Sequence, residues 1–432
     1  MAVWLKTADP DFEDRFSALL AQKREQAADV NDAVASIIGR VRAEGDRALI
    51  ELTRKFDGLD LREAGLRVSE AEIAGARAKV DKNTLAALTL AHERILDHHR
   101  RQVPKDDIYK DALGVELGTR WTPVASAGLY VPGGTASYPS SVLMNALPAK
   151  VAGVSRIVMT VPAPKGTLNP LVLVAAELAG VSEIYRVGGA QAIAALAYGT
   201  ESIAPVAKIV GPGNAYVAAA KRQVYGQVGI DMVAGPSEVV VIADGDNDPP
   251  WIAADLLAQA EHDEAAQAIL ITDDAMFARR VEQAVEDELR LLPRAVVARA
   301  SWRDFGAIIE VKTLDEAPSI ADRLAPEHLE IATDHADALA AKVRNAGAIF
   351  VGRYTPEVIG DYVAGSNHVL PTARSARFAS GLSVYDFMKR TSLLKLDAEA
   401  LAALGPAAMT LAKAEGLDAH RRSVAIRLNP RD

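Results

Sequence analysis

From Ala127 onward the sequence repeats one pattern, in which a short apolar run leads into a glycine turn and then into a helical stretch. The first block of apolar runs and turns lies within 127–134, 156–161, 183–189 and 208–214. Strands that alternate with helices in this way form parallel sheets, because parallel neighbours need a crossover connection. The pattern therefore predicts an α/β unit built on a parallel sheet.

A second block with the same layout begins at Ser237. Its apolar runs are typical of strands buried on both faces, and they lie at 238–243, 268–272, 329–332 and 348–351. Between them, residues 276–289 place apolar side chains at four-residue steps, which predicts a helix. The two blocks predict two α/β domains of similar build, although no literal sequence repeat joins them.

The two ends of the chain differ from these blocks. The first hundred residues show helical spacing, including a long predicted helix at 81–101, and residues 115–121 alternate as a strand does. After Gly381 the parallel-sheet pattern stops. Pro406 to Glu415 is predicted to be a helix that Gly416 ends, and this tail needs another surface to dock on.

Composition excludes several classes of protein. There is no cysteine, which excludes disulfides, thiolate catalysis and thiolate metal ligands. The formal net charge is −9 without a long basic run, so we expect no nucleic-acid partner. The N-terminus lacks a signal-peptide layout, and the most apolar stretch, near 171–181, is too short to span a bilayer. We therefore expect a cytoplasmic protein that does not bind membranes.

The segment 255–263 follows Asp248-Pro-Pro, a favourable helix start, and contains Gln259 and His262. On a helix, residues three apart share one face. An imidazole and an amide oxygen placed in this way can supply half of a metal site. The alternative is a solvated histidine among surface carboxylates.

Glu327 and His328 form the strongest catalytic candidate. They are adjacent, follow Pro326 and precede an apolar strand, which places them on a short loop at a strand end, where α/β sites commonly lie. Histidine suits proton transfer near neutral pH, and a neighbouring carboxylate can orient water. A solvated surface loop is the competing interpretation.

Two further segments carry candidate ligands. Asp361 and His368 flank a glycine turn in 360–368, and Asp361 can serve as an oxygen ligand for a metal. Glu415 and His420 lie five apart around Gly416, a spacing that does not align them on one helical face. Ordinary turn chemistry also accounts for the residues of 360–368.

The turn Gly211-Pro-Gly-Asn-Ala-Tyr216 resembles a dinucleotide fingerprint but has Tyr216 at its third glycine position. Such a turn at a helix N-terminus favours phosphate. Phosphate sugars and small anions would bind to the same kind of turn.

Taken together, these segments resemble the histidinol dehydrogenase family over residues 20–428. The similarity rests on eight ordered motifs: GLYVPGG (128–134), VGGAQAIAALAYGT (187–200), GPGNAYV (211–217), AGPSEV (234–239), LLAQAEHD (256–263), APEHLE (325–330), GDYVAGSNHVLPT (360–372) and EGLDAHRRSV (415–424).

The resemblance implies the last step of histidine biosynthesis, in which L-histidinol is oxidised to L-histidine through L-histidinaldehyde. It implies one Zn²⁺ per subunit and two NAD⁺ consumed per turnover. His328 would be the general base, and Glu327 would activate water for the second oxidation. The implied zinc ligands are Gln259, His262, Asp361 and His420. The implied substrate contacts are Ser237, Gln259, His262, His328, Asp361, His368, Glu415 and His420. The implied NAD contacts are Tyr130, Gln191 and Asn214.

The expected fold is two similar, incomplete doubly wound Rossmann-like domains with parallel sheets, a helical N-terminal segment and a C-terminal arm. We expect an N-terminal segment at 1–23, a first domain at 24–108 and 237–381 with the zinc and catalytic loops, an NAD-binding domain at 109–236, and a helical arm at 382–432.

The resemblance also implies a homodimer with shared active sites, in which His420 of one chain completes the metal site of the other. Two other interpretations remain at this point. Similar family members oxidise other small alcohols, including sulfonated diols, and a two-domain α/β chain can also be a solute-binding module. A carboxylate in 415–420 favours histidinol, whereas the Glu327–His328 loop disfavours a binding module.

Overall fold

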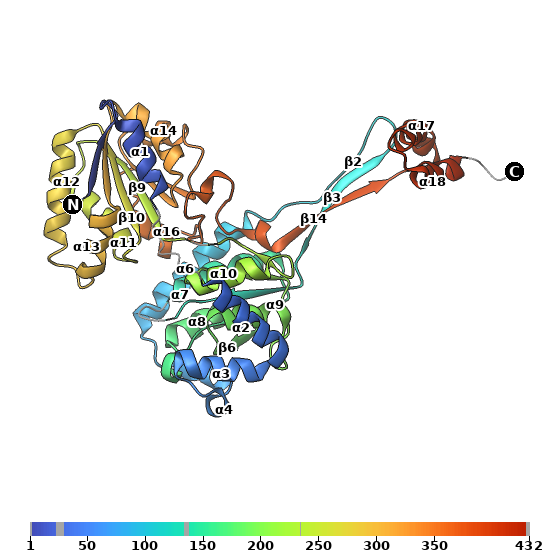
Figure 1. Ribbon diagram of the computed structural model, residues 1–432, viewed down its shortest axis with the longest axis horizontal. Helices are drawn as coiled ribbons and strands as arrows, with labels where there is room; N and C mark the ends of the chain where they lie inside the picture. Colours follow the sequence, from blue (N-terminus) through green and yellow to red (C-terminus); the bar gives the residue numbers. More distant parts are fainter. Residues whose placement is uncertain (1, 23–29, 134–137, 234, 429–432) are drawn as a thin grey trace.

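The computed structural model describes residues 2–22, 30–133, 138–233 and 235–428. Two parallel sheets, each covered by helices on both faces, form the body of the molecule, and a narrow antiparallel ribbon extends away from it and ends in two helices (Figure 1). The arrangement confirms the predicted α/β class with parallel sheets. No helix of the described residues is long and apolar enough to cross a membrane.

The five-stranded sheet has the order β6-β5-β4-β7-β8, and every pair of neighbours is parallel. Its strands are β4 (Ser126–Tyr130), β5 (Arg156–Thr160), β6 (Glu183–Tyr185), β7 (Lys208–Val210) and β8 (Gly229–Ile230). Its own crossover helices are α7 (Pro139–Ala152), α8 (Pro170–Ala179), α9 (Gly189–Tyr198) and α10 (Ala215–Val224).

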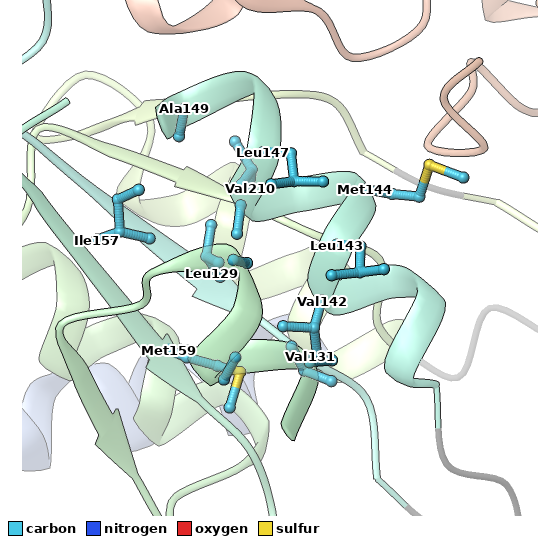
Figure 2. Close-up of a cluster of buried hydrophobic side chains, with 14 of the residues drawn as sticks. Leu129, Val131, Val142, Leu143, Met144, Leu147, Ala149, Ile157, Met159 and Val210 are labelled. Atoms are coloured by element: carbon cyan, nitrogen blue, oxygen red, sulfur yellow. The ribbon is translucent and has the colours of Figure 1, made fainter. Parts of the chain in front are cut away.

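Helix α7 is apolar on nearly all sides because it is buried between this sheet and its neighbouring helices. Leu143 and Leu147 are fully buried and belong to one cluster with Leu129 of β4 and Ile157 of β5 (Figure 2). Burying an aliphatic side chain of this size stabilises a fold by about 1.5–3 kcal/mol. The continuous apolar sequence of the helix therefore reflects its central position.

The six-stranded sheet has the order β1-β11-β10-β9-β12-β13 and is also parallel throughout. Its strands are β1 (Val3–Lys6), β9 (Glu238–Ala243), β10 (Gln267–Thr272), β11 (Ala307–Glu310), β12 (His328–Ala332) and β13 (Ala348–Val351). The accompanying helices are α1 (Phe12–Ala21), α11 (Pro249–Ala260), α12 (Ala275–Glu288), α13 (Ala295–Phe305), α14 (Ala317–Leu324), α15 (Ala336–Ala340) and α16 (Glu357–Tyr362).

Both sheets follow the same strand order. If the strands of each unit are numbered along the chain from β4 or from β9, each sheet reads 3-2-1-4-5, and β1 is an extra edge strand on the second sheet. This is the order of an incomplete doubly wound Rossmann-like unit, whose switch point lies between its strands 1 and 4. The predicted similarity of the two blocks is thus confirmed at the level of topology.

The helices α2 (Asn31–Glu44), α3 (Asp46–Asp57), α4 (Leu61–Ala64), α5 (Glu70–Arg77) and α6 (Lys82–Arg100) show that grouping 24–108 with 237–381 is wrong. These helices pack on the five-stranded sheet. The buried face of α2, including Val34 and Val41, joins one cluster with α9 and α10, and Ile95 of α6 joins the cluster around α7. An apolar stripe predicts that a helix is buried, but it does not identify the sheet that buries it.

The N-terminal segment at 1–23 is predicted to be helical, but it begins with a strand. Val3–Lys6 forms β1 and pairs in parallel with Ala307–Glu310, and Phe12 and Phe16 of α1 bury against the same sheet. A four-residue strand whose partner lies about three hundred residues away leaves no local signal.

The arm also differs from the helical prediction for 382–432. It begins as β14 (Met388–Lys395), which pairs antiparallel with β3 (Glu116–Pro123), and β2 (Asp107–Lys110) completes the ribbon. Helix α17 (Ala398–Ala414) contains Pro406 in its interior, so the predicted start at Pro406 is wrong. Helix α18 (Asp418–Leu428) follows and packs on α17 where Gly405 allows close approach to Leu428.

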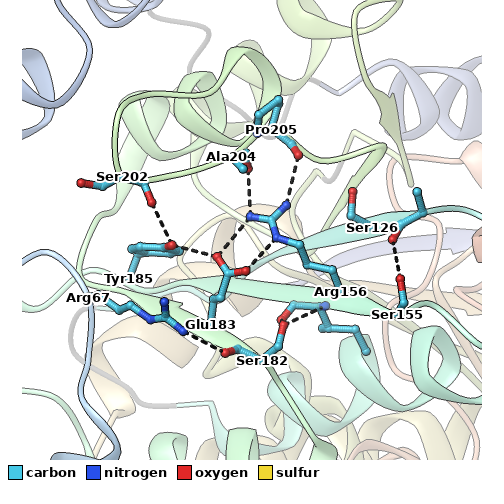
Figure 3. A network of polar contacts seen from close by, with 12 residues as sticks. Arg67, Ser126, Ser155, Arg156, Ser182, Glu183, Tyr185, Ser202, Ala204 and Pro205 are labelled. Carbon is cyan, nitrogen blue, oxygen red and sulfur yellow. Dashed lines mark hydrogen bonds and ion pairs between the residues drawn. The ribbon is translucent and has the colours of Figure 1, made fainter.

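A polar network stabilises the amino ends of β5 and β6 (Figure 3). Arg156 donates two hydrogen bonds to Glu183, at 2.7 and 3.1 Å, and two more to the carbonyls of Ala204 and Pro205. The Tyr185 hydroxyl donates to Glu183 at 2.8 Å. The bond from Arg156 holds the pKa of Glu183 below its usual range.

Candidate active site

A cavity of about 850 Å³ lies between the two sheet units. One side is formed by residues that follow β4, β7 and β8, namely Pro132, Gly211 and Asp231. The opposite side is formed by Ser237, just before β9, and by Glu327 and His328 at the start of β12. The cavity thus meets the carboxyl ends of one parallel sheet and the amino ends of the other.

This position refines the expectation for Glu327 and His328. Ligands of doubly wound folds bind at the carboxyl ends of strands, and the five-stranded sheet obeys this rule at its switch point between β4 and β7. In the six-stranded sheet the catalytic candidates lie at the opposite, amino edge of β9 and β12. Glu327 and His328 thus lie at a strand end, as predicted, but at the amino end of β12 and not at the carboxyl end where such sites commonly lie.

One peptide segment holds both catalytic candidates. The Glu238 backbone N–H donates to Glu327 Oε2 at 3.0 Å, and the Glu238 carbonyl accepts from His328 Nδ1 at 3.0 Å. The Ser237 side chain is also hydrogen bonded to Glu327. Strand pairing brings these groups together, because His328 lies opposite Val239 in the parallel register of β12 and β9.

The hydrogen bond to Glu238 places the proton of a neutral His328 on Nδ1 and leaves Nε2 as the proton acceptor. Nε2 is buried and has no hydrogen-bond partner among the described residues; it faces Asp361 Oδ1 at 3.7 Å. Burial lowers the pKa of His328, but the nearby carboxyl groups of Glu357, Glu327 and Asp361 outweigh burial and raise this pKa to about 10. The surrounding carboxyl groups therefore favour the protonated ring, and His328 can accept a proton at Nε2 only when another cation offsets these carboxyl groups.

Glu357 is a site residue that the sequence interpretation missed. It is the first residue of α16, it is almost fully buried, and its Oε2 lies 3.5 Å from His328 Nδ1. Burial raises its pKa to about 8. Glu357 precedes Asp361 by four residues, so helical spacing alone would have placed both carboxyls on one face.

Behind Glu357 lies a further buried carboxyl. The Glu357 backbone N–H donates to Glu330 Oε1 at 2.5 Å, and Glu330 is hydrogen bonded to Asp255 of α11. Burial, followed by the neighbouring acids, raises the pKa of Glu330 well above its usual range, and burial raises that of Asp255 to about 6. Buried acids this close retain protons, because they cannot all ionise together.

Three of the four predicted zinc ligands lie on the cavity wall. Gln259 is buried and its Oε1 has no hydrogen-bond partner among the described residues. His262 Nδ1 donates to the Ala258 carbonyl at 2.9 Å, which leaves Nε2 with its lone pair, and Asp361 adds a carboxylate. An amide oxygen, an imidazole and a carboxylate suit Zn²⁺, and a cation beside Asp361 would lower the high pKa of His328.

No group of three or more histidine, aspartate or glutamate side chains able to hold a metal occurs in the described parts of the chain. The fourth predicted ligand, His420, lies on α18 and is exposed at the tip of the arm, with Glu415 at the end of α17 (Figure 1). The structure does not bring these two residues to the cavity of their own chain. Within the described residues of one chain, three of the four predicted ligands therefore line the cavity.

His368 lies on the cavity wall as predicted, and both of its ring nitrogens have neighbours. Nδ1 donates to the Asp361 carbonyl at 3.0 Å, and Nε2 lies 3.3 Å from Ser141 Oγ at the start of α7. His368 therefore links the loop that carries Asp361 to the five-stranded unit. Burial lowers its pKa.

The three predicted NAD contacts lie at the carboxyl edge of the five-stranded sheet. Asn214 lines the cavity and caps α10, accepting from the N–H groups of Tyr216 and Val217. Tyr130 is buried at the end of β4, and its hydroxyl accepts from the Gly189 N–H at 3.2 Å. Gln191 is buried in α9. Gly134, the last residue of the glycine turn after β4, lies outside the described residues.

Comparisons with known proteins agree over the whole chain. The family model described as histidinol dehydrogenase matches residues 20–428. Histidinol dehydrogenases of Brucella suis and Mesorhizobium japonicum are 68% and 67% identical over 429 residues, which cover 99% of this chain and 100% of each relative. The crystal structure of histidinol dehydrogenase from Elizabethkingia anophelis superposes with a TM-score of 0.94 at 36% identity, covering 99% of this chain and 98% of that one.

Proposed function

The chain belongs to the histidinol dehydrogenase family, and from this premise we propose that it oxidises L-histidinol to L-histidine in two successive steps with NAD⁺. The observation that carries the chemistry is the anchoring of Glu327 and His328 by the one peptide segment at Glu238, on the wall of the cavity. A base and a water-activating carboxylate at one point match a reaction that first removes a hydroxyl proton and then adds water.

In the first step His328 Nε2 accepts the proton of the substrate hydroxyl while the C–H electron pair leaves as hydride. This converts the alcohol to an aldehyde and releases one proton. The Nδ1–H bond to the Glu238 carbonyl keeps the ring oriented with Nε2 toward the cavity. Asn214 and the turn before α10 would hold NAD⁺, which would supply the hydride acceptor.

In the second step water adds to the aldehyde, and a second C–H electron pair leaves as hydride from the hydrate while His328 accepts the proton of a hydrate hydroxyl. Glu327 takes a proton from the attacking water, which needs its ionised form. Burial raises the pKa of Glu327, and a protonated His328 beside it opposes that rise.

One Zn²⁺ per subunit would be held by Gln259, His262 and Asp361, together with His420 of a second chain. Bound there, it would supply a Lewis acid that anchors the amine and imidazole of the substrate. Ser237, His368 and, from the second chain, Glu415 would complete the substrate contacts. These assignments require a homodimer with exchanged arms, and a cytoplasmic location stays a prediction.

The test is to incubate the zinc-loaded protein with L-histidinol and NAD⁺. We expect two NADH for each L-histidine formed, with no NADH from a sulfonated diol under the same conditions. The matched control is a His328→Gln protein, which retains a hydrogen-bonding side chain but no base. Oxidation of the diol in preference to histidinol, or no oxidation of either, would contradict the proposal.

A further inference from the structure

A buried ion pair forms part of the cavity wall. Lys221 of α10 pairs with Asp231, the residue after β8, and their side chains are only 2% and 1% exposed. Lys221 Nζ also donates to the Gly211 carbonyl at 2.9 Å, and the Gly211 N–H donates to Asp231 Oδ2 at 2.8 Å. The two members of the pair thus hold the carbonyl and the N–H of a single glycine.

Gly211 needs such support because regular structure does not provide it. Strand β7 ends at Val210 and α10 begins at Ala215, and within the described residues Gly211 makes no backbone–backbone hydrogen bond. Its φ is +115°, and a Cβ at this position would lie 2.2 Å from the carbonyl oxygen of Tyr130. The backbone here is both unusual and tightly packed, and only the ion pair fixes its polar groups.

Stability alone does not account for a pair of this kind. Burying two charges costs solvation energy, and apolar side chains of similar volume often stabilise a fold equally well or better. A structural role would therefore not require this chemistry. Its position is informative, because the pair holds the turn at the switch point between β4 and β7, where doubly wound sheets bind their ligands.

The turn also faces the cavity directly. Gly211, Pro212, Gly213 and Asn214 all line it, as do Lys221 and Asp231. Asn214 is fixed by capping α10, so the position of Gly211 sets where Asn214 and the helix N-terminus point. A shift of this turn would move Asn214 and the N-terminus of α10 relative to a ligand in the cavity.

We propose that Lys221 and Asp231 are positioning residues for the dinucleotide, holding the Gly211–Asn214 turn in the conformation that binds NAD. The proposal rests on the proposed function only in the identity of the ligand. It predicts that breaking the pair weakens dinucleotide binding selectively, because the groups proposed to contact histidinol lie on other elements.

The test measures the binding of NADH alone, by its fluorescence, to the zinc-loaded protein without histidinol. We expect Lys221→Met and Asp231→Asn each to raise the Kd for NADH by about tenfold or more. In steady-state assays the KM for NAD⁺ should rise similarly, while the KM for histidinol changes less than about twofold. Lys221→Arg, which keeps the cation, should retain part of the affinity.

Two variants separate positioning from stability. Lys221→Met combined with Asp231→Leu leaves no buried charge without its partner, so it should recover the part of the stability that an unpaired charge costs in each single variant. It still leaves the carbonyl and the N–H of Gly211 unpaired, so it should not recover the NADH affinity. Glu183→Gln breaks a different ion pair at the amino edge of the same sheet, and it should leave the Kd for NADH unchanged.

Wild-type Kd values in the folded single variants would overturn the proposal, as would wild-type affinity in the double variant. If the single variants do not fold, the double variant and Lys221→Arg still decide. A protein that binds NADH in a Lys221-dependent way but does not oxidise histidinol would contradict the proposed function and leave this inference intact. If the protein oxidises histidinol but the variants bind NADH with wild-type affinity, the proposed function would stand and this inference would be contradicted.

Discussion

His328 Nδ1 lies 3.8 Å from Glu327 Oε2, although the two residues are neighbours at the start of a strand. The contact exists because Glu327 ends the loop and His328 begins β12, and the Glu238 segment pulls both side chains to one side. A base and a carboxylate held at this distance interact electrostatically without sharing a proton. They can therefore be tested as separate groups with separate steps.

Glu327→Gln should slow acid formation from histidinaldehyde more than it slows the alcohol step, because only the second oxidation needs water. General-base groups contribute about 10²–10⁴-fold, so we expect a loss in this range for the aldehyde step. Single-turnover measurements starting from each substrate check the prediction, and His328→Gln, which should slow both steps, is the comparison. Equal slowing of both steps by Glu327→Gln would count against the division of roles.

His262→Ala should lower metal content and activity together, because it removes the only imidazole that this chain supplies to its proposed zinc site. Losing a ligand or its support commonly costs about 10–100-fold in metal affinity or activity. Metal analysis of the dialysed protein and turnover measurements check this. The matched control is His335→Ala, an exposed histidine at the carboxyl end of β12. A metal-free preparation with full activity would show that the site has another role.

Mixing inactive His262→Ala and inactive His420→Ala proteins, after unfolding and refolding them together, should restore part of the activity. His420 lies at the tip of the arm, so in a mixed dimer one site carries both changes and the other carries neither. With random pairing, recovery should approach about a quarter of the wild-type activity. Mixed dimers shown to be present but inactive, or an active monomer in sedimentation, would assign the arm to its own chain.

Glu183→Gln should lower the urea midpoint of unfolding at pH 7, where loss of the bonds from Arg156 and Tyr185 costs about 1–3 kcal/mol. The pKa of Glu183 is lowered by folding from an ordinary value of 4.5, so its stabilising effect is present above pH 4.5. It is lost as the pH falls through the lower pKa of the folded state. Unfolding curves of both proteins at pH 7 and below pH 4 check this. A difference in midpoint that stays constant would contradict it.

Most of the body could be predicted from the sequence, because buried parallel strands and their glycine turns leave local patterns. The strands β4 to β7, β9, β10, β12 and β13 all fall within predicted runs to within one residue at their starts. The partners of α2, α3 and α6 could not be predicted, since an apolar face fits either sheet. Strand β14 was missed for a related reason: Met388–Lys395 is mostly polar and mostly exposed, so no burial shaped its sequence.

Some residues of the candidate site could likewise be predicted from the sequence, and others could not. Asp361, His262 and the Glu327–His328 pair were predictable because they stand in recognisable motifs. Glu357 and the Lys221–Asp231 pair were missed because single charged residues in a sequence do not show that they are buried. Their importance arises from which strand ends and helices meet, and that is a property of the assembled sheets.

The pairing of β1 with β11 sets an order of events during synthesis. The helices of 31–100 and all five strands of the smaller sheet leave the ribosome before β9 does, so that unit can fold while translation continues. Val3–Lys6 leaves the ribosome first of all, yet its partner strand follows about three hundred residues later. The earliest strand of the chain therefore waits unpaired, and the larger sheet gains this edge only once β11 has been made.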